Sequence, residues 1–533
     1  MSDLRAASAA ALVDTARDCS RAENIAAARK LAVMAELFDR RTALATAAER
    51  QNWWVDPDAA VAAELAAALG VTQGLALAQT HRAVALRDRL PGVAALFAQG
   101  FISDLLVRAI VYRTGLITDP AVMAEVDAAL ARQVGFWGAL SQVKVEQAID
   151  ATVISHDPAA QRVPAGGRGR ERRIEFGDPD DPPGLMSVHA RMHAGDAAAL
   201  RDRIKAIAGT VCEADPRTLS TLRDDALAAI CWGFDALACR CGQTDCEGAA
   251  RPAPTPNTTV YLITDTTTLD TAATGAATAQ DAPTADTAAQ SAPSAETSPG
   301  PQIHTDTQTE PAIEFEPPTE AKPAPAPSPS PAPKPALLFG AGLLPATALP
   351  PLLGNARIRT IVHPGNSPAE PRYLPSRALA EFIRCRDLTC RFPNCDIAST
   401  TADIDHTVPY PLGPTHASNL KALCRFHHLL KTFWTGPGGW YDRQHPDGTV
   451  EWTSPTGHTY ITKPGSALLF PSLCKPTGIL WTKDPPTSEH HPQRGAMMPQ
   501  RRYTRAQAQA RYIKLLRRLN EHGITPPDTS PPF

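Results

Sequence analysis

The chain has 533 residues, 43% of them hydrophobic, which allows two or three domains that each bury a core. No run approaches the roughly 20 apolar residues of a membrane span, and the first residues lack the apolar segment of a secretion signal, so we expect no membrane partner. The net charge of −3 does not by itself indicate a nucleic-acid binder. Eleven cysteines, several at ligand spacing, indicate reduced thiols and metal ligands in the cytoplasm.

Alanine-rich segments with apolar residues at helical spacing dominate the first 160 residues. The predicted helices there cover residues 25–48, 59–69, 73–90 and 119–131. Two strand-like segments and two helical ones follow, at 173–176, 186–192, 195–211 and 216–237. A last strand-like segment covers residues 258–264. We therefore predict a mostly α-helical N-terminal domain with a small sheet over residues 25–264.

A group of cysteines lies near the end of this domain. Cys239, Cys241 and Cys246 are close in sequence, and Cys231 precedes them by a couple of helical turns. The group allows two interpretations, a second zinc site or a loop whose thiols bind nothing, because its spacing is irregular and no His joins it.

The composition changes abruptly after this domain. Residues 265–335 are rich in Thr, Ala, Pro and Ser, with ten acidic residues against two lysines. Such a segment has too few large apolar groups for a core, so we predict a disordered acidic Pro/Thr/Ala-rich linker. Its charge would repel DNA, and residues 336–373 form a connecting segment.

Four residues of the C-terminal third have the spacing of a zinc site. Cys390 and Cys395 are separated by four residues, and Cys424 and His427 by two. Two such pairs suit a closed tetrahedral Zn²⁺ site. Cys385 is an alternative ligand, although the tighter turn favours Cys390.

A second set of ligands is interleaved with the first. Asp405 and His406 are adjacent, so on an extended strand one can bind a divalent cation while the other faces a substrate water. Asn419 begins an apolar pattern at helical spacing, which predicts a helix over 419–431. Ser418 would cap that helix.

His427 and His428 would then differ by about 100° in direction on the predicted helix. This difference lets His427 complete the zinc site while His428 turns toward Asp405. A single histidine is more often an ordinary core or surface residue, but the combination with the zinc ligands favours a second metal site.

In this order the residues resemble the HNH endonucleases, whose ββα-metal fold places two strands and a helix around one catalytic divalent ion. The matching residues are Cys390, Cys395, Asp405, His406, Asn419, Cys424, His427, His428 and Lys431. Residues 374–469 are also similar to actinobacterial proteins that join a C-terminal HNH module to a long helical domain of unknown function. Two departures are His427, where Cys is commoner, and Gly413-Pro414, where Gly-Gly is usual.

The resemblance implies a role for each matching residue. His406 would be the general base that activates water, and Asn419 would hold the loop and help to orient that base. Asp405 and His428 would bind the catalytic ion, which is Mg²⁺, Mn²⁺, Ni²⁺ or Zn²⁺. The structural zinc ligands would be Cys390, Cys395, Cys424 and His427.

Metal-assisted hydrolysis of a phosphodiester needs an attacking hydroxide and a cation beside the phosphoryl oxygens. The base must be a neutral imidazole to accept a proton from water. Activity is therefore expected to fall below about pH 6.5, the unperturbed imidazole pKa.

The C-terminal tail, residues 471–533, is basic. Residues 464–533 contain ten Lys or Arg against four acidic residues, and 501–521 are predicted to form one helix. The tail helix either packs on the protein or contacts phosphates. The candidate DNA contacts are Arg391, Lys421, Arg425 and Lys431 in the module, and Arg511, Lys514, Arg517 and Arg518 in the tail.

The sequence thus predicts an α+β protein that ends in a zinc-stabilised ββα-metal module over residues 374–470. The expected function is hydrolysis of DNA by a single-metal endonuclease. Two alternatives remain: a non-catalytic, zinc-stabilised DNA-binding protein, and an interaction protein of mobile elements whose N-terminal domain carries the function.

Overall fold

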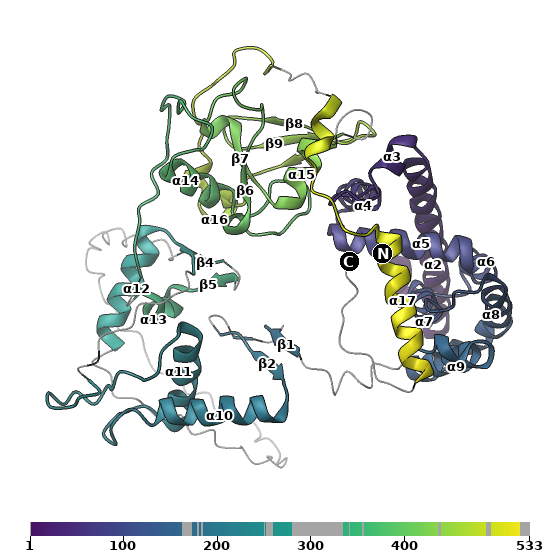
Figure 1. The fold of residues 1–533 in the computed structure, drawn as a ribbon, viewed down its shortest axis with the longest axis horizontal. Helices are drawn as coiled ribbons and strands as arrows, with labels where there is room; N and C mark the ends of the chain where they lie inside the picture. The colour runs from purple at the N-terminus through teal and green to yellow at the C-terminus, as the bar shows by residue number, and fades with distance from the viewer. Residues whose placement is uncertain are drawn as a thin grey trace, which may run out of the picture.

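The computed structural model describes residues 2–522 except 163–172, 179–180, 183–184, 250, 252–259, 280–333, 340–341, 354–355, 435–438 and 487–491. Figure 1 shows a body of N-terminal helices on one side and a module with short strands from the C-terminal third beside it. The fold is α+β, with a mostly helical N-terminal part and small antiparallel sheets. The predicted fold class is confirmed.

The helical body is built around α2 (Ala9–Thr42), which packs against α4 (Pro57–Leu69), α5 (Gln73–Arg89) and α6 (Pro91–Ala98). The N-cap of α4 is Asp56, whose carboxylate accepts the Ala59 N–H at 2.9 Å. This helix ends at Gly70, which adopts the left-handed conformation with φ of 67°. The other elements of the body are α1 (Ser2–Ala6), α3 (Ala45–Glu49), α7 (Asp104–Arg113), α8 (Pro120–Gln133), η1 (Val134–Ala139), α9 (Gln142–His156) and η2 (Pro158–Ala160).

The C-terminal helix α17 (Arg505–Glu521) returns to this body (Figure 1). Leu516 is buried in the same apolar core as the N-terminal helices. Arg517 donates to the Asp157 carboxylate at 2.6 Å and to the Leu116 carbonyl at 2.9 Å. The helix begins four residues later than predicted because Thr504 forms a capping box with Gln507.

A small lobe follows the helical body. The strands β1 (Arg173–Phe176) and β2 (Val188–Arg191) form an antiparallel hairpin, as the alternation of residues predicts. The helices α10 (Ala194–Ala208) and α11 (Leu219–Trp232) pack on each other around a small core. The cysteine-rich loop that follows α11 belongs to this lobe.

The start of the predicted linker is wrong. Residues 266–279 form α12 (Thr266–Ala279), in which Ala272 is buried. The strand before it, β3 (Leu262–Ile263), pairs with β4 (Ala336–Leu338), which pairs with β5 (Gly342–Leu344). Residues 280–333, most of the predicted linker, lie outside the described part of the chain. The elements on the two sides of residues 280–333 therefore belong to one small unit. This unit also includes η4 (Ala346–Ala348) and α13 (Pro350–Leu353).

The C-terminal module contains the two strands and one helix that the sequence predicts, with different boundaries. β6 (Asp403–His406) pairs antiparallel with β7 (Leu420–Leu423), and α15 (Arg425–Phe433) packs against both. A three-stranded sheet of β8 (Tyr441–Gln444), β9 (Val450–Thr453) and β10 (Thr459–Thr462) lies next along the chain. The remaining elements are α14 (Arg377–Asp387), η5 (Ser399–Thr401), η6 (Ala417–Asn419), α16 (Ser466–Leu469), η8 (Pro471–Cys474) and η9 (Pro492–Met497).

The module and the helical body share an apolar core. Alanines of α4, among them Ala59 and Ala63, are buried in one cluster with Leu429 and Leu430 of α15. The Trp434 indole N–H donates to the Val55 carbonyl at 2.8 Å. The two regions are thus joined by buried contacts rather than only by the chain.

No single helix among the described residues is long and apolar enough to cross a membrane, although α4 and α5, bent by 109°, pass the same test of length and composition as a pair.

Candidate metal sites of the C-terminal module

The first site is formed by the four predicted zinc ligands. Their ligand atoms all lie within 4.8 Å of one another. The Sγ atoms of Cys395 and Cys424 are 3.9 Å apart, close to the roughly 3.8 Å expected across a tetrahedral Zn²⁺ with Zn–S bonds of about 2.3 Å. The His427 Nδ1 is 3.2 Å from the Cys424 Sγ. The donor set therefore fits Zn²⁺, with Nδ1 as the imidazole ligand.

Local structure places each of these ligands. Asn394 adopts a positive φ of 56°, which turns the chain between Cys390 and Cys395. Cys424 is the N-cap of α15, so His427 lies in the first turn above it. Cys385 lies on α14 and is not part of the cluster, which leaves Cys390 as the ligand.

The thiols need a cation to ionise together. Burial raises the pKa of Cys390 well above its usual value, whereas hydrogen bonds from Cys390 and Cys395 hold the pKa of Cys424 below its usual value. Three adjacent thiolates repel one another, and Zn²⁺ would remove that repulsion. The ring of Phe392 stacks on His427 at 3.9 Å between centroids and shields the cluster.

A second group of charges surrounds Asp405. Its Oδ2 lies 2.8 Å from the Lys421 Nζ and 2.6 Å from the Lys431 Nζ. Burial acts to raise the pKa of Asp405, but the two lysines and His428 outweigh burial and hold it below the usual range. Asp442 of β8 adds a second carboxylate, 2.5 Å from the Lys421 Nζ. Asp405 is thus an anion whose Oδ1 faces away from the lysines.

His428 is oriented toward that free oxygen. Its Nδ1 is 2.8 Å from the Asp403 Oδ2, and its Nε2 is 3.6 Å from the Asp405 Oδ1. When the Nδ1–H of His428 donates to Asp403, the Nε2 lone pair is directed at Asp405. In metal sites a second carboxylate orients a metal-binding histidine in this way. The Asp405 Oδ1 and His428 Nε2 are therefore suited to share one divalent cation.

His406 lies on the opposite side of β6 from Asp405, as predicted for adjacent residues of a strand. Its Nε2 is 2.9 Å from the Thr415 Oγ1, and that hydroxyl donates to the Arg372 carbonyl at 2.5 Å. Since a hydroxyl has one proton, Thr415 must accept from Nε2–H, which leaves the Nδ1 lone pair free. The ring of Tyr373 stacks on His406 at 5.3 Å between centroids.

Burial lowers the pKa of His406 to about 4. The expected loss of activity below about pH 6.5 assumed an unperturbed imidazole. The buried ring is neutral well below that pH, so it can accept a proton over a wider range.

The prediction of a helix from Asn419 is wrong. Leu420–Leu423 forms β7, because these residues pair with β6, and the helix starts only at Arg425. Asn419 lies before β7, and its amide bonds both the N–H and the carbonyl of Val408, at 2.8 and 3.0 Å. Asn419 thus holds the loop after His406 in place.

The candidate DNA contacts in the module differ in exposure. Arg391 is 2% exposed and donates to the Thr462 carbonyl at 2.6 Å. Lys421 is fully buried, and Lys431 is almost so, against Asp405. Burial excludes Arg391 and Lys421 from a surface that meets DNA, which corrects both predictions. Arg425 is exposed.

In the tail, Arg517 is used in its ion pair with Asp157, so it holds α17 on the helical body. Arg511, Lys514 and Arg518 are exposed on that helix. The sequence had left open whether the helix packs on the protein, and its apolar side does so. The exposed side remains a candidate phosphate contact.

Sequence reasoning missed Asp403, Thr415 and Tyr373. Asp403 carried a usable signal, since residues two apart on a strand share a face and Asp403 precedes Asp405 by two. Thr415 and Tyr373 reach His406 only through the folding of separate loops.

The ββα arrangement together with the Cys₃His group fits a zinc-binding HNH-like module. Residues 18–295 match the model of the family described as Domain of unknown function (DUF222). The chain belongs to this family. The match covers most of the helical body, the cysteine-rich lobe, β3 and α12, and it ends before the ββα module.

Relatives cover both parts of the chain. Uncharacterized protein Rv2100 of Mycobacterium tuberculosis is 42% identical over 98% of this chain and 90% of its own length. Uncharacterized protein Rv3776 of the same organism is 43% identical over 96% of this chain and 90% of its own length. The comparison with solved structures gives no match.

Proposed function

We propose that this protein is a metal-dependent endonuclease that hydrolyses DNA phosphodiester bonds in the cytoplasm. The observation that carries the proposal is the orientation of His428 by Asp403, which directs Nε2 at the free Oδ1 of Asp405. A structural zinc module has no need of this pair. A divalent cation held by Asp405 and His428 would supply positive charge beside the phosphoryl oxygens.

The chain's own residues supply the proton transfer. The Nδ1 of His406 accepts the proton of the attacking water, because Thr415 keeps the proton of the ring on Nε2. Asn419 holds the loop that follows His406, which limits movement of the base. The exposed ring of Tyr373, stacked on His406, would offer a nucleotide an apolar surface beside the base.

The lysines have a different role from the one first expected. Lys421 and Lys431 hold Asp405 ionised and turn one oxygen away from themselves. DNA contact would instead come from exposed groups near the site, Arg425 and Arg372, and from the exposed face of α17.

Cleavage of supercoiled plasmid by the full-length chain tests the proposal. Each divalent cation is added to protein whose zinc is already bound, because a chelator would also strip the structural site. His406→Ala and His428→Ala should each lower the rate by roughly 100-fold or more. The matched control is His458→Ala, since His458 is exposed on the hairpin of β9 and β10; it should cleave like the unmodified protein.

A zinc-loaded chain that binds DNA but cleaves with none of Mg²⁺, Mn²⁺, Ni²⁺ or Zn²⁺ would reject the proposal. That result would favour the non-catalytic DNA-binding alternative.

A further inference from the structure

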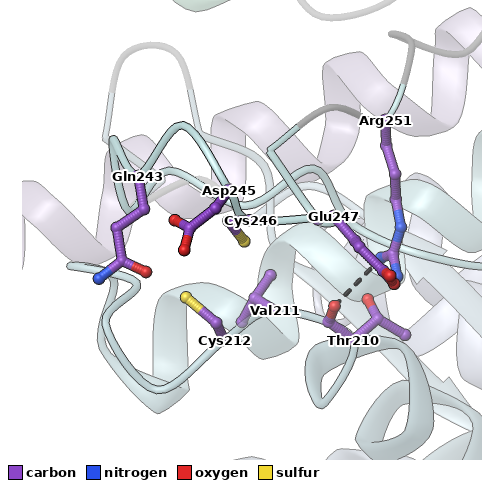
Figure 2. A pocket seen from close by; sticks show the side chains of 9 residues that line it. Thr210, Val211, Cys212, Gln243, Asp245, Cys246, Glu247 and Arg251 are labelled. Atoms are coloured by element: carbon purple, nitrogen blue, oxygen red, sulfur yellow. Dashed lines mark hydrogen bonds between the residues drawn. The ribbon is translucent and has the colours of Figure 1, made fainter.

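A second group of thiols lies in the DUF222 region, far in sequence from the ββα module. It comprises Cys212, Cys239, Cys241 and Cys246, whose Sγ atoms all lie within 4.8 Å of one another. Cys212 follows α10, and the other three lie in the loop after α11. Figure 2 shows the sulfur atoms of Cys212 and Cys246 facing the same pocket. The sequence grouped three of these residues with Cys231, which is instead exposed on α11.

Backbone hydrogen bonds hold the loop that carries three of these thiols. The Cys239 N–H donates to the Gly248 carbonyl at 2.9 Å, and the Cys246 N–H to the Gln243 carbonyl at 3.4 Å. The Ala249 N–H donates to the Cys246 carbonyl at 3.0 Å. The bond between Cys239 and Gly248 closes the loop, so its two ends lie beside each other.

Two glycines permit these turns. Gly242 adopts the left-handed conformation with φ of 70° directly after Cys241. A Cβ on Gly248 would lie 3.0 Å from the Cys239 Cβ and 3.6 Å from the Cys246 Sγ. A side chain at position 248 would therefore crowd Cys239, and glycine lets the backbone pass close to the thiols.

The apolar core beside this loop is small. Besides the partly buried residues packed against it, it has five buried members among the described residues of the lobe: Ile207, Ala208, Ala226, Ala229 and Leu237. So small a core rarely holds a fold without a disulfide or a metal. The Sγ atoms of Cys212 and Cys239 are 3.4 Å apart, beyond the roughly 2.05 Å of a disulfide. Arg217 braces the loop from one side, donating to Asp215 and to the Ala238 carbonyl.

We propose that Cys212, Cys239, Cys241 and Cys246 bind a second structural Zn²⁺, which fastens the end of α10 to the loop after α11. Four thiolates at this separation form the Cys₄ set of a closed structural site. The inference does not rest on the proposed nuclease function, because these residues take no part in the ββα module.

Metal analysis of the full-length chain tests this inference. Cys212→Ser should lower the zinc content by one ion per chain relative to the unmodified protein. Cys231→Ser is the matched control, because it removes a cysteine of the same lobe that lies outside the cluster, and it should leave the content unchanged. Equal zinc in the unmodified protein and in Cys212→Ser would overturn the proposal.

A second measurement does not require that any variant fold. In the unmodified zinc-loaded protein, alkylation followed by peptide mass mapping should label Cys231 at once. Labelling of the four cluster cysteines should begin only after a chelator is added. Immediate labelling of all four, or a disulfide between Cys212 and Cys239 in protein kept under reductant, would show that no zinc is bound there.

Discussion

Lys421 is the residue whose removal should most clearly expose the electrostatics of the ββα module. Its side chain is fully buried, and its Nζ lies 2.8 Å from Asp405 and 2.5 Å from Asp442. Burial acts to lower the pKa of Lys421, but the two carboxylates outweigh burial and raise it, so the group is charged. Replacement by Met keeps an unbranched side chain as far as Cε and removes the ammonium group. Lys431 is then left alone with two buried carboxylates.

The cost follows from these contacts. At an effective dielectric constant near 20, each of the two ion pairs amounts to about 6 kcal/mol of Coulomb attraction. Most of that attraction only offsets the cost of burying the charges. Loss of one partner from a buried ion pair typically destabilises the folded protein by about 3–5 kcal/mol. Lys421→Met should therefore lower the free energy of opening of β6 and β7 by about 3 kcal/mol or more. That change corresponds to amide exchange faster by roughly 150-fold, since about 1.4 kcal/mol is a factor of ten.

Hydrogen exchange followed by mass spectrometry measures this change in the full-length protein. Amides of α8 in the helical body serve as the internal reference and should not change. The double variant Lys421→Met with Asp442→Leu should recover most of the protection, because it removes a carboxylate together with the cation. Exchange in the single variant within about threefold of the unmodified protein would refute the reasoning, since the two carboxylates would then not depend on Lys421.

Four further outcomes are expected. At saturating cation, cleavage should change less than twofold between pH 7 and 5.5, because the pKa of His406 is lowered to about 4; a fall near tenfold would indicate an unperturbed imidazole with a pKa of about 6.5. Asp403→Asn should weaken binding of the divalent cation by roughly 10- to 100-fold in calorimetry while zinc stays bound; Asp396→Asn, at an exposed position of the zinc turn, should not. Arg517→Gln should destabilise the helical body in thermal unfolding and leave the salt dependence of DNA binding unchanged, because its charge is used against Asp157; a flatter slope would place it on DNA. Cys424→Ser should lose the module's zinc and unfold the ββα module in hydrogen exchange, whereas retained zinc would remove Cys424 from the ligand set.

Local signals were sufficient to group the four residues of the Cys₃His cluster. The spacing of Cys390 and Cys395, and of Cys424 and His427, is set by a tight turn and one helical turn, and both depend on neighbouring residues only. The alternation of Asp405 and His406 follows in the same way from the geometry of a strand. The prediction for Leu420–Leu423 was wrong because the spacing of its apolar residues suits either a helix or a strand. These residues form a strand because they pair with β6.

Exposure and long-range proximity were decided only by the tertiary structure. Lys421 and Arg391 are basic residues beside the motif, so the sequence alone predicted that they contact DNA. In the structure Lys421 packs against Asp405 and Arg391 against the β-hairpin, and both are buried. Cys212 joins Cys239 only because α10 packs on α11, a contact for which no spacing rule exists. The sequence by itself determined the chemistry available at each site, because the type of each ligand and the local turns depend only on short segments of the chain. The three-dimensional packing determined which charges neutralise one another and which cysteine completes the second cluster, because these depend on residues that meet only after folding.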